Sequence, residues 1–205
     1  MNFSTIKPSV YHYLSYRKMP CDPSVDSMIC ECLDELERMD SFKFLYAEYD
    51  ELLDFLHAEP YASFLTGSDG YFLLACTLGI EVDRVIRCLS LTDMTKMIIF
   101  DASANAFLEY MAETHKKQLG EKLSYIFCPG YAGSSVDDLK FIFRELDLKR
   151  IGMELNESNL IIPQKSMVGI VGKGISPQMR CDGCIKEKNC FFRKEGRLCY
   201  RSEQN

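Results

Sequence analysis

The feature that most constrains the fold is the stretch from Asp93 to Gly120, which reads as one long helix. Asp93 is a favourable N-cap and Gly120 a favourable C-terminal stop. The first half of this helix is apolar on almost every side, so we expect it to be buried against several neighbours. The apolar residues are Met94, Met97, Ile98, Ile99, Phe100, Ala102, Ala104, Ala106, Phe107 and Leu108.

Three polar residues, Asp101, Asn105 and Glu109, interrupt the apolar surface of this helix. Their i, i+4, i+8 spacing places them along one face, which we call the polar stripe. Carboxylates are costly to bury unless something hydrogen-bonds them. The stripe therefore either lines a cavity that holds a polar ligand or forms a thin solvated edge, and solvated stripes are the commoner case.

The segment before the long helix predicts a helix, two strands and a second helix. Asp22 precedes a proline, and an amphipathic pattern then covers 23–39. Alternating apolar residues predict a half-buried strand at 42–47, and the apolar run 70–78 predicts a buried one. A further helix is expected at 81–89.

The segment after the long helix predicts strands and one more helix. Residues 125–128 look like a strand that ends at a Pro-Gly turn, and three short β segments are expected at 151–155, 160–162 and 166–172. Strands joined by short loops favour an α+β fold, with a twisted antiparallel or mixed sheet and flanking helices. Ser135 and Asp138 resemble a capping box, with a buried helix face of Val136, Leu139, Ile142, Phe143 and Leu146.

Charge and cysteine content divide the chain into a body, 1–172, and a tail, 173–205. The tail has eight Lys or Arg residues against four Asp or Glu, whereas the whole chain has 24 against 30, which leaves 16 − 26 = −10 for the body. The acidic body argues against a surface built for nucleic acid or anionic membrane. Without a long apolar run or a signal peptide, we expect a cytoplasmic protein.

Four of the ten cysteines lie in the tail, with the spacing C-x2-C-x5-C-x8-C. Four thiolates can enclose one metal in a tetrahedral site, so the tail predicts either a zinc site or an iron–sulfur cluster, which spacing does not separate. Surface thiols or disulfides are the alternative. The predicted ligands are Cys181, Cys184, Cys190 and Cys199.

A resemblance covers most of the chain, from about Val10 to Cys199. The stretches LGIEVDRVIRCLSLTDMTKMIIFDASANAFLEYMAE, CPGY and KRIGMELNESNLIIPQKSMVGIVG, in this order, resemble the reactivation domain of cobalamin-dependent methionine synthase. They are still more similar to the free-standing relatives of that domain in anaerobic bacteria. The resemblance implies a C-shaped α+β domain that binds S-adenosylmethionine.

The resemblance also implies a function in reductive reactivation. Inert Co(II) cobalamin on a partner, a corrinoid-dependent methyltransferase, receives one electron from a donor such as flavodoxin or ferredoxin and is then methylated from S-adenosylmethionine. The chain would be an accessory component that is not catalytic alone. A cluster held by the tail cysteines would be a plausible electron relay.

The site residues implied by the resemblance are Glu109 and the turn at Cys128, Pro129, Gly130 and Tyr131, with Asp101 and Asn105 as further candidates from the polar stripe. One departure concerns Ile126, which stands where the family has an arginine that grips the ligand's carboxylate. We therefore expect weak binding, which an Ile126→Arg exchange would strengthen.

Two other functions stay open. The chain could be an electron-transfer or cofactor-loading adaptor for a corrinoid protein without binding S-adenosylmethionine, which Ile126 favours. Alternatively, the basic tail with Phe191, Phe192 and Tyr200 could be a zinc knuckle that stacks on single-stranded RNA, which the acidic body disfavours.

Overall fold

The centre of the computed structural model, which describes residues 3–16 and 22–175, is a three-stranded antiparallel sheet. The strand order is β1 (Lys43–Tyr49), β2 (Tyr71–Thr77) and β5 (Ser166–Gly172). Every residue of β2 is buried, because both its edges are paired and both its faces are covered. The predicted α+β class is confirmed.

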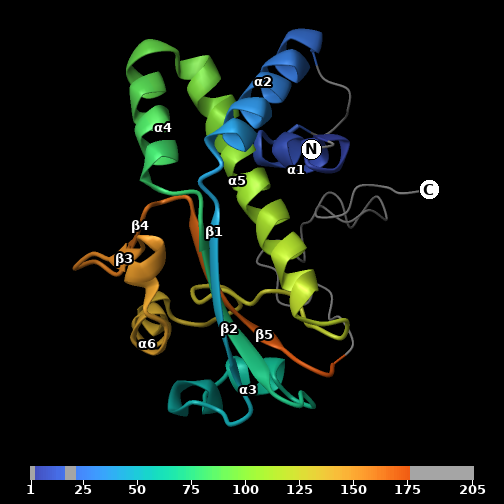
Figure 1. Cartoon of the computed structure of the whole chain (residues 1–205), viewed down its shortest axis with the longest axis vertical. Coiled ribbons are helices and arrows are strands. Elements are labelled where there is room, and N and C mark those ends of the chain that lie inside the picture. Colours follow the sequence, from blue (N-terminus) through green and yellow to red (C-terminus); the bar gives the residue numbers. More distant parts are fainter. Residues whose placement is uncertain (1–2, 17–21, 176–205) are drawn as a thin grey trace.

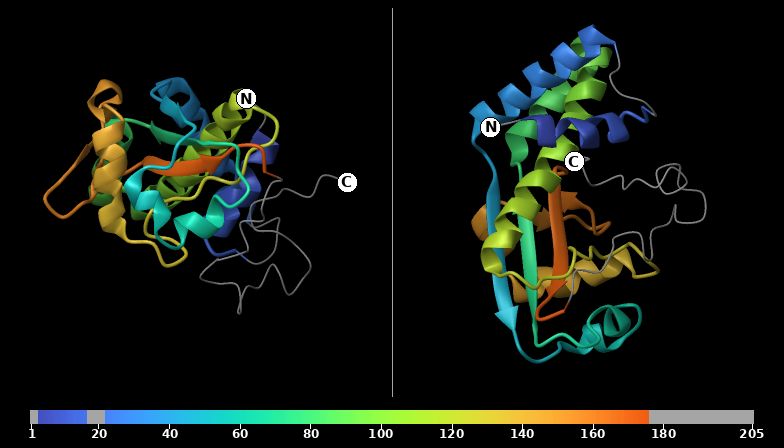
Figure 2. Two further views of the ribbon diagram at one scale, coloured as in Figure 1. Left: turned by 90° about the horizontal axis from the view of Figure 1, so that it is seen from below. Right: turned by 90° about the vertical axis from the view of Figure 1, so that its right-hand side faces the viewer.

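Helices cover the sheet in two groups, and side chains of β2 alternate between the two cores beneath them. Phe72, Leu74 and Cys76 face the first core, and Tyr71, Leu73 and Ala75 face the second. The first group is α1 (Lys7–Tyr13), α2 (Pro23–Met39), α4 (Ile80–Thr92) and α5 (Met94–Lys116), and the second includes α3 (Tyr61–Phe64) and α6 (Leu139–Glu145). Figure 1 and the right-hand view of Figure 2 show α1, α2 and α4 toward the upper end of the strands, α5 running down beside them, and α3 below them.

The long helix begins as expected but is less completely buried than its composition indicates. The Asp93 carboxylate accepts the Lys96 N–H at 2.9 Å, as an N-cap does. The helix ends at Lys116, and a 3-10 turn leads on to Gly120. Met94 and Ile98 are 55% and 51% exposed, whereas Ile99 and Phe100 are buried, so the first turns of α5 have one exposed face. None of the helices in the described ranges has the length and apolar character needed to cross a bilayer.

The strand expected at 125–128 is not a regular strand. Only two isolated bridges join the segment to β5, Leu123 with Lys173 and Phe127 with Ile170. The ladder breaks because the carbonyl of Ser124 accepts from Lys116, so the N–H of Gly172 donates to the Ser124 hydroxyl instead. From Ser124 to Phe127 the segment has one residue more than β5 opposite it, which is the arrangement of a β-bulge.

Two further expectations after α5 need correction. The capping box of Ser135 and Asp138 is present, but it opens a 3-10 turn, and Val136 stays 47% exposed because it precedes α6. The strand expected at 151–155 is only β3 (Glu154–Leu155), since 3-10 helix Leu148–Ile151 comes first. β3 pairs with β4 (Ile161–Ile162) in a separate ribbon.

Candidate functional site

The first half of the polar stripe is neutralised by a lysine from the other end of the domain. Lys165, which directly precedes β5, lies 2.7 Å from an Asp101 oxygen and donates to the Asn105 carbonyl at 2.8 Å. The lysine is only 9% exposed, so Asp101 satisfies a charge that would otherwise be costly to bury. The Asp101 side chain itself is 39% exposed, so this end of the stripe is a partly solvated ion pair.

Asp101 and Asn105 also line a hollow of about 260 Å³ between α1 and α5. The rest of its wall is mainly apolar, which makes the polar pair the groups that could orient a ligand there. The other lining residues are Tyr13, Leu14, Met97, Ile98 and Ala102.

Glu109 lies one turn further along the stripe and has a different environment. Its carboxylate accepts a hydrogen bond of 2.8 Å from the Tyr13 hydroxyl of α1. The bond crosses 96 positions of sequence and ties α1 to the middle of α5. Tyr13 was not among the predicted site residues, because a lone tyrosine in a short N-terminal helix carries no pattern.

The turn Cys128–Tyr131 is held by its own backbone and by one serine. The Tyr131 N–H donates to the Cys128 carbonyl, and the Ser134 hydroxyl donates to the Tyr131 carbonyl at 2.7 Å and accepts from the Gly130 N–H. Gly130 has a φ of +91°, and a Cβ there would come within 2.9 Å of Val136. Glycine is therefore required at this corner. The turn presents Tyr131 with 67% of its surface exposed.

The strand β5 brings the turn and Glu109 to the same level. Lys165 meets α5 at Asp101 and Asn105, and Gly172 is joined through Ser124 to Lys116. From Lys165 to Gly172 the chain advances by seven residues, or about 23 Å, and from Asp101 to Lys116 the helix advances by fifteen residues, or about 22 Å. The two elements therefore run side by side over this length. Because Phe127 pairs with Ile170, Cys128 falls at about the level of Glu109.

Ile126 occupies the core two residues before the turn Cys128–Tyr131. It is 4% exposed, and Gly169 of β5 leaves room for it, since a Cβ on Gly169 would overlap the Ile126 side chain and approach the Phe127 carbonyl oxygen to 3.0 Å. An arginine at position 126 would have to leave the core or bury its charge. An Ile126→Arg exchange should therefore destabilise the fold, and we no longer expect it to strengthen binding.

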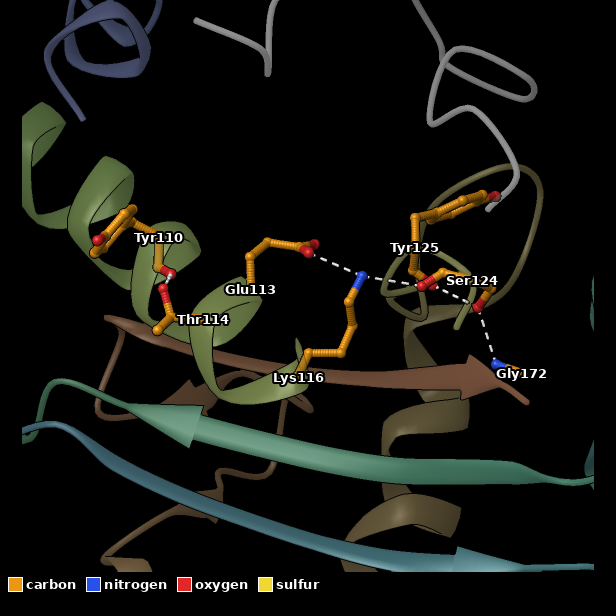
Figure 3. A network of polar contacts seen from close by, with 7 residues as sticks. All are labelled: Tyr110, Glu113, Thr114, Lys116, Ser124, Tyr125 and Gly172. Atoms are coloured by element: carbon orange, nitrogen blue, oxygen red, sulfur yellow. Dashed lines mark hydrogen bonds and ion pairs between the residues drawn. The ribbon is translucent and has the colours of Figure 1, made fainter. Parts of the chain in front are cut away.

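A buried lysine joins α5 to the segment that leads into the turn (Figure 3). Lys116 is 8% exposed, forms an ion pair of 2.8 Å with Glu113 and donates to the Ser124 carbonyl at 2.9 Å. Figure 3 shows Glu113 and Ser124 on opposite sides of the Lys116 ammonium. The contacts of Ser124 with Lys116 and with Gly172 fix the position of 122–128 against both α5 and β5.

The predicted metal ligands Cys181, Cys184, Cys190 and Cys199 lie outside the described residues. Within 3–16 and 22–175, His, Cys, Asp and Glu side chains form no group of three or more that could hold a metal. Burial raises the pKa of the Cys32 thiol to about 11 and that of Cys76 further, which makes both thiols unreactive core residues.

The chain is similar in structure to one described as "Crystal Structure of the MetH Reactivation Domain bound to AdoHcy". The TM-score is 0.55 at 14% identity, and the match covers 96% of this chain and 82% of the other. No family model matches the sequence, and no curated protein matches it. At this identity the likeness is one of fold, and we conclude that the chain folds like that reactivation domain.

Proposed function

We propose that the chain binds S-adenosylmethionine between α5 and the turn Cys128–Tyr131, and assists the reductive reactivation of a corrinoid-dependent methyltransferase such as methionine synthase. The observation that carries the proposal is the fold match along nearly the whole chain to a domain whose structure holds AdoHcy. The partner would hold the cobalamin, and S-adenosylmethionine would supply its methyl group.

The residues at the proposed binding site suit such a ligand. Glu109 offers a carboxylate to the ligand's ammonium, and its position is held by Tyr13. The backbone of Cys128, Pro129 and Gly130 can approach a ligand closely because Gly130 has no side chain. Tyr131 presents an exposed ring with a polar tip. Asp101 and Asn105 lie further along the same helix face and would contact a ligand only if it extends into the hollow beside α1.

Calorimetry on the full chain tests the proposal. We expect S-adenosylmethionine to bind, and Glu109→Gln to weaken binding about 10-fold or more, because a charge-assisted hydrogen bond contributes about 1.5–3 kcal/mol. Glu81→Gln is the matched control, since Glu81 lies on the exposed surface of α4 with Arg84. Absence of binding heat with the wild-type chain at millimolar ligand would refute the proposal.

The adaptor function is the second candidate, and the burial of Ile126 favours it. Position 126 offers an apolar side chain inside the core, so it contributes no charge to a ligand's carboxylate. An adaptor should associate with a corrinoid protein in its Co(II) state and show no binding of S-adenosylmethionine. Pull-down with and without the ligand separates the two functions.

A further inference from the structure

Lys116 is the last residue of α5. Glu109, Glu113 and Lys116 are spaced i, i+4, i+7, so all three fall on one face of the helix. Helical side chains lean toward the N-terminus, and the ion pair of Lys116 with Glu113 shows that its ammonium does so. The cation therefore lies about one turn, or about 6 Å along the axis, from Glu109.

The charges on this face complement those of S-adenosylmethionine. The ligand carries two positive groups, the ammonium and the sulfonium, and one carboxylate. The face carries two carboxylates, Glu109 and Glu113, and one ammonium, Lys116. A hydrogen bond of about 2.8 Å from the ligand's ammonium to Glu109 and another from Lys116 to the ligand's carboxylate would bridge the two side chains. The ammonium and the carboxylate of the ligand lie on the same carbon, so together these contacts span about one helical turn.

Lys116 has a donor to spare for this contact. An ammonium carries three N–H groups, and among the described residues Lys116 directs two of them at Glu113 and at the Ser124 carbonyl. The alternative cation on this helix face, Lys165, is held by Asp101 and Asn105 at the opposite end. Figure 3 shows the Lys116 ammonium between Glu113 of α5 and Ser124 of the segment that leads into the turn.

We propose that Lys116 binds the carboxylate of the ligand while Glu109 binds its ammonium, an inference that rests on the proposed function. The ligand then lies with its amino-acid end toward the end of α5 and its adenosine toward the turn Cys128–Tyr131. Lys116 thereby selects for ligands that keep the carboxylate, a role that the buried Ile126 cannot perform.

The test compares S-adenosylmethionine with decarboxylated S-adenosylmethionine, which differs only in the carboxylate, by calorimetry on the full chain. In the wild type the decarboxylated ligand should bind about 10- to 100-fold more weakly. In Lys116→Met this ratio should fall to about 3-fold or less, and in Lys116→Arg most of it should remain. The matched control is Lys7→Met, which breaks an ion pair of the same 2.8 Å with Asp26 and should leave the ratio unchanged.

A purely structural lysine gives a different pattern, because its loss would weaken both ligands by the same factor. An unchanged ratio in Lys116→Met, or a wild-type ratio near one, overturns the inference and leaves the proposed function standing. Failure of the wild type to bind either ligand refutes the proposed function itself. Should Lys116→Met not fold, Lys116→Gln can still donate to the Ser124 carbonyl without the charge, and the same loss of ratio is expected.

Discussion

Gly169 is predicted to be the residue of β5 on which the position of the turn depends. Its missing side chain lets Ile126 lie against the strand, and a Cβ would overlap Ile126 and approach the Phe127 carbonyl oxygen to 3.0 Å. Both contacts belong to the bulged segment that leads directly into Cys128. Because the oxygen is backbone and Ile126 is buried, neither neighbour can move without shifting this segment.

The magnitude of a Gly169→Ala exchange follows from two opposing terms. Removing a glycine from a strand stabilises by about 0.5–1 kcal/mol through the unfolded state. Overpacking a filled core costs about 1–3 kcal/mol. Because a Cβ at Gly169 would overlap the buried Ile126 side chain, the overpacking cost should lie in the upper part of its range. We therefore expect a net loss of about 1–2 kcal/mol in the free energy of unfolding. With a slope of about 2 kcal/mol/M, the midpoint of urea unfolding should fall by about 0.5–1 M.

Gly172→Ala is the matched control, since it lies on the same strand and its nearest neighbour, at 2.9 Å, is the flexible end of the Ile175 side chain. It should cost little. Ile126→Ala combined with Gly169→Ala should cancel part of the penalty, because the overlapping atom is gone. The reasoning fails if Gly169→Ala unfolds at the same urea concentration as the wild type, or if the double variant shows no coupling.

Three further exchanges have defined outcomes. Lys165→Met should lower the free energy of unfolding by about 1 kcal/mol by leaving the partly exposed Asp101 without its cation, and an unchanged urea midpoint would show that the ion pair does not stabilise the fold. Ile126→Arg should cost about 3 kcal/mol or more, against less than about 1.5 for Ile126→Leu, and equal stabilities would contradict the burial of this side chain. Protein purified without oxygen should carry either iron and sulfide or one zinc, and Cys184→Ser should release it; all four tail thiols freely alkylated after reconstitution would argue against a metal site.

Local patterns in the sequence were sufficient for α2, α5 and β2, but not for α1 and α3, which no pattern indicated, or for 125–128, which is not a regular strand. The N-caps Asp22 and Asp93, the buried run that became β2 and the capping box at Ser135 each depend on neighbours within a few residues. Such signals predict helix starts and buried strands reliably because the interactions that produce them are local. The alignment of the polar stripe on one face of α5 follows from the same geometry.

The partners of that stripe were decided by the tertiary structure alone. Lys165 meets Asn105 across 60 positions of sequence, and Tyr13 meets Glu109 across 96. The break in the β-ladder at Ser124 depends on the hydrogen bond that Lys116 donates to the Ser124 carbonyl. The burial of Ile126 depends on Gly169, which lies 43 positions away in the sequence (169 − 126). Periodicity reports which face of an element is covered, but not which residue covers it, because that choice is made by the packing of segments distant in the chain.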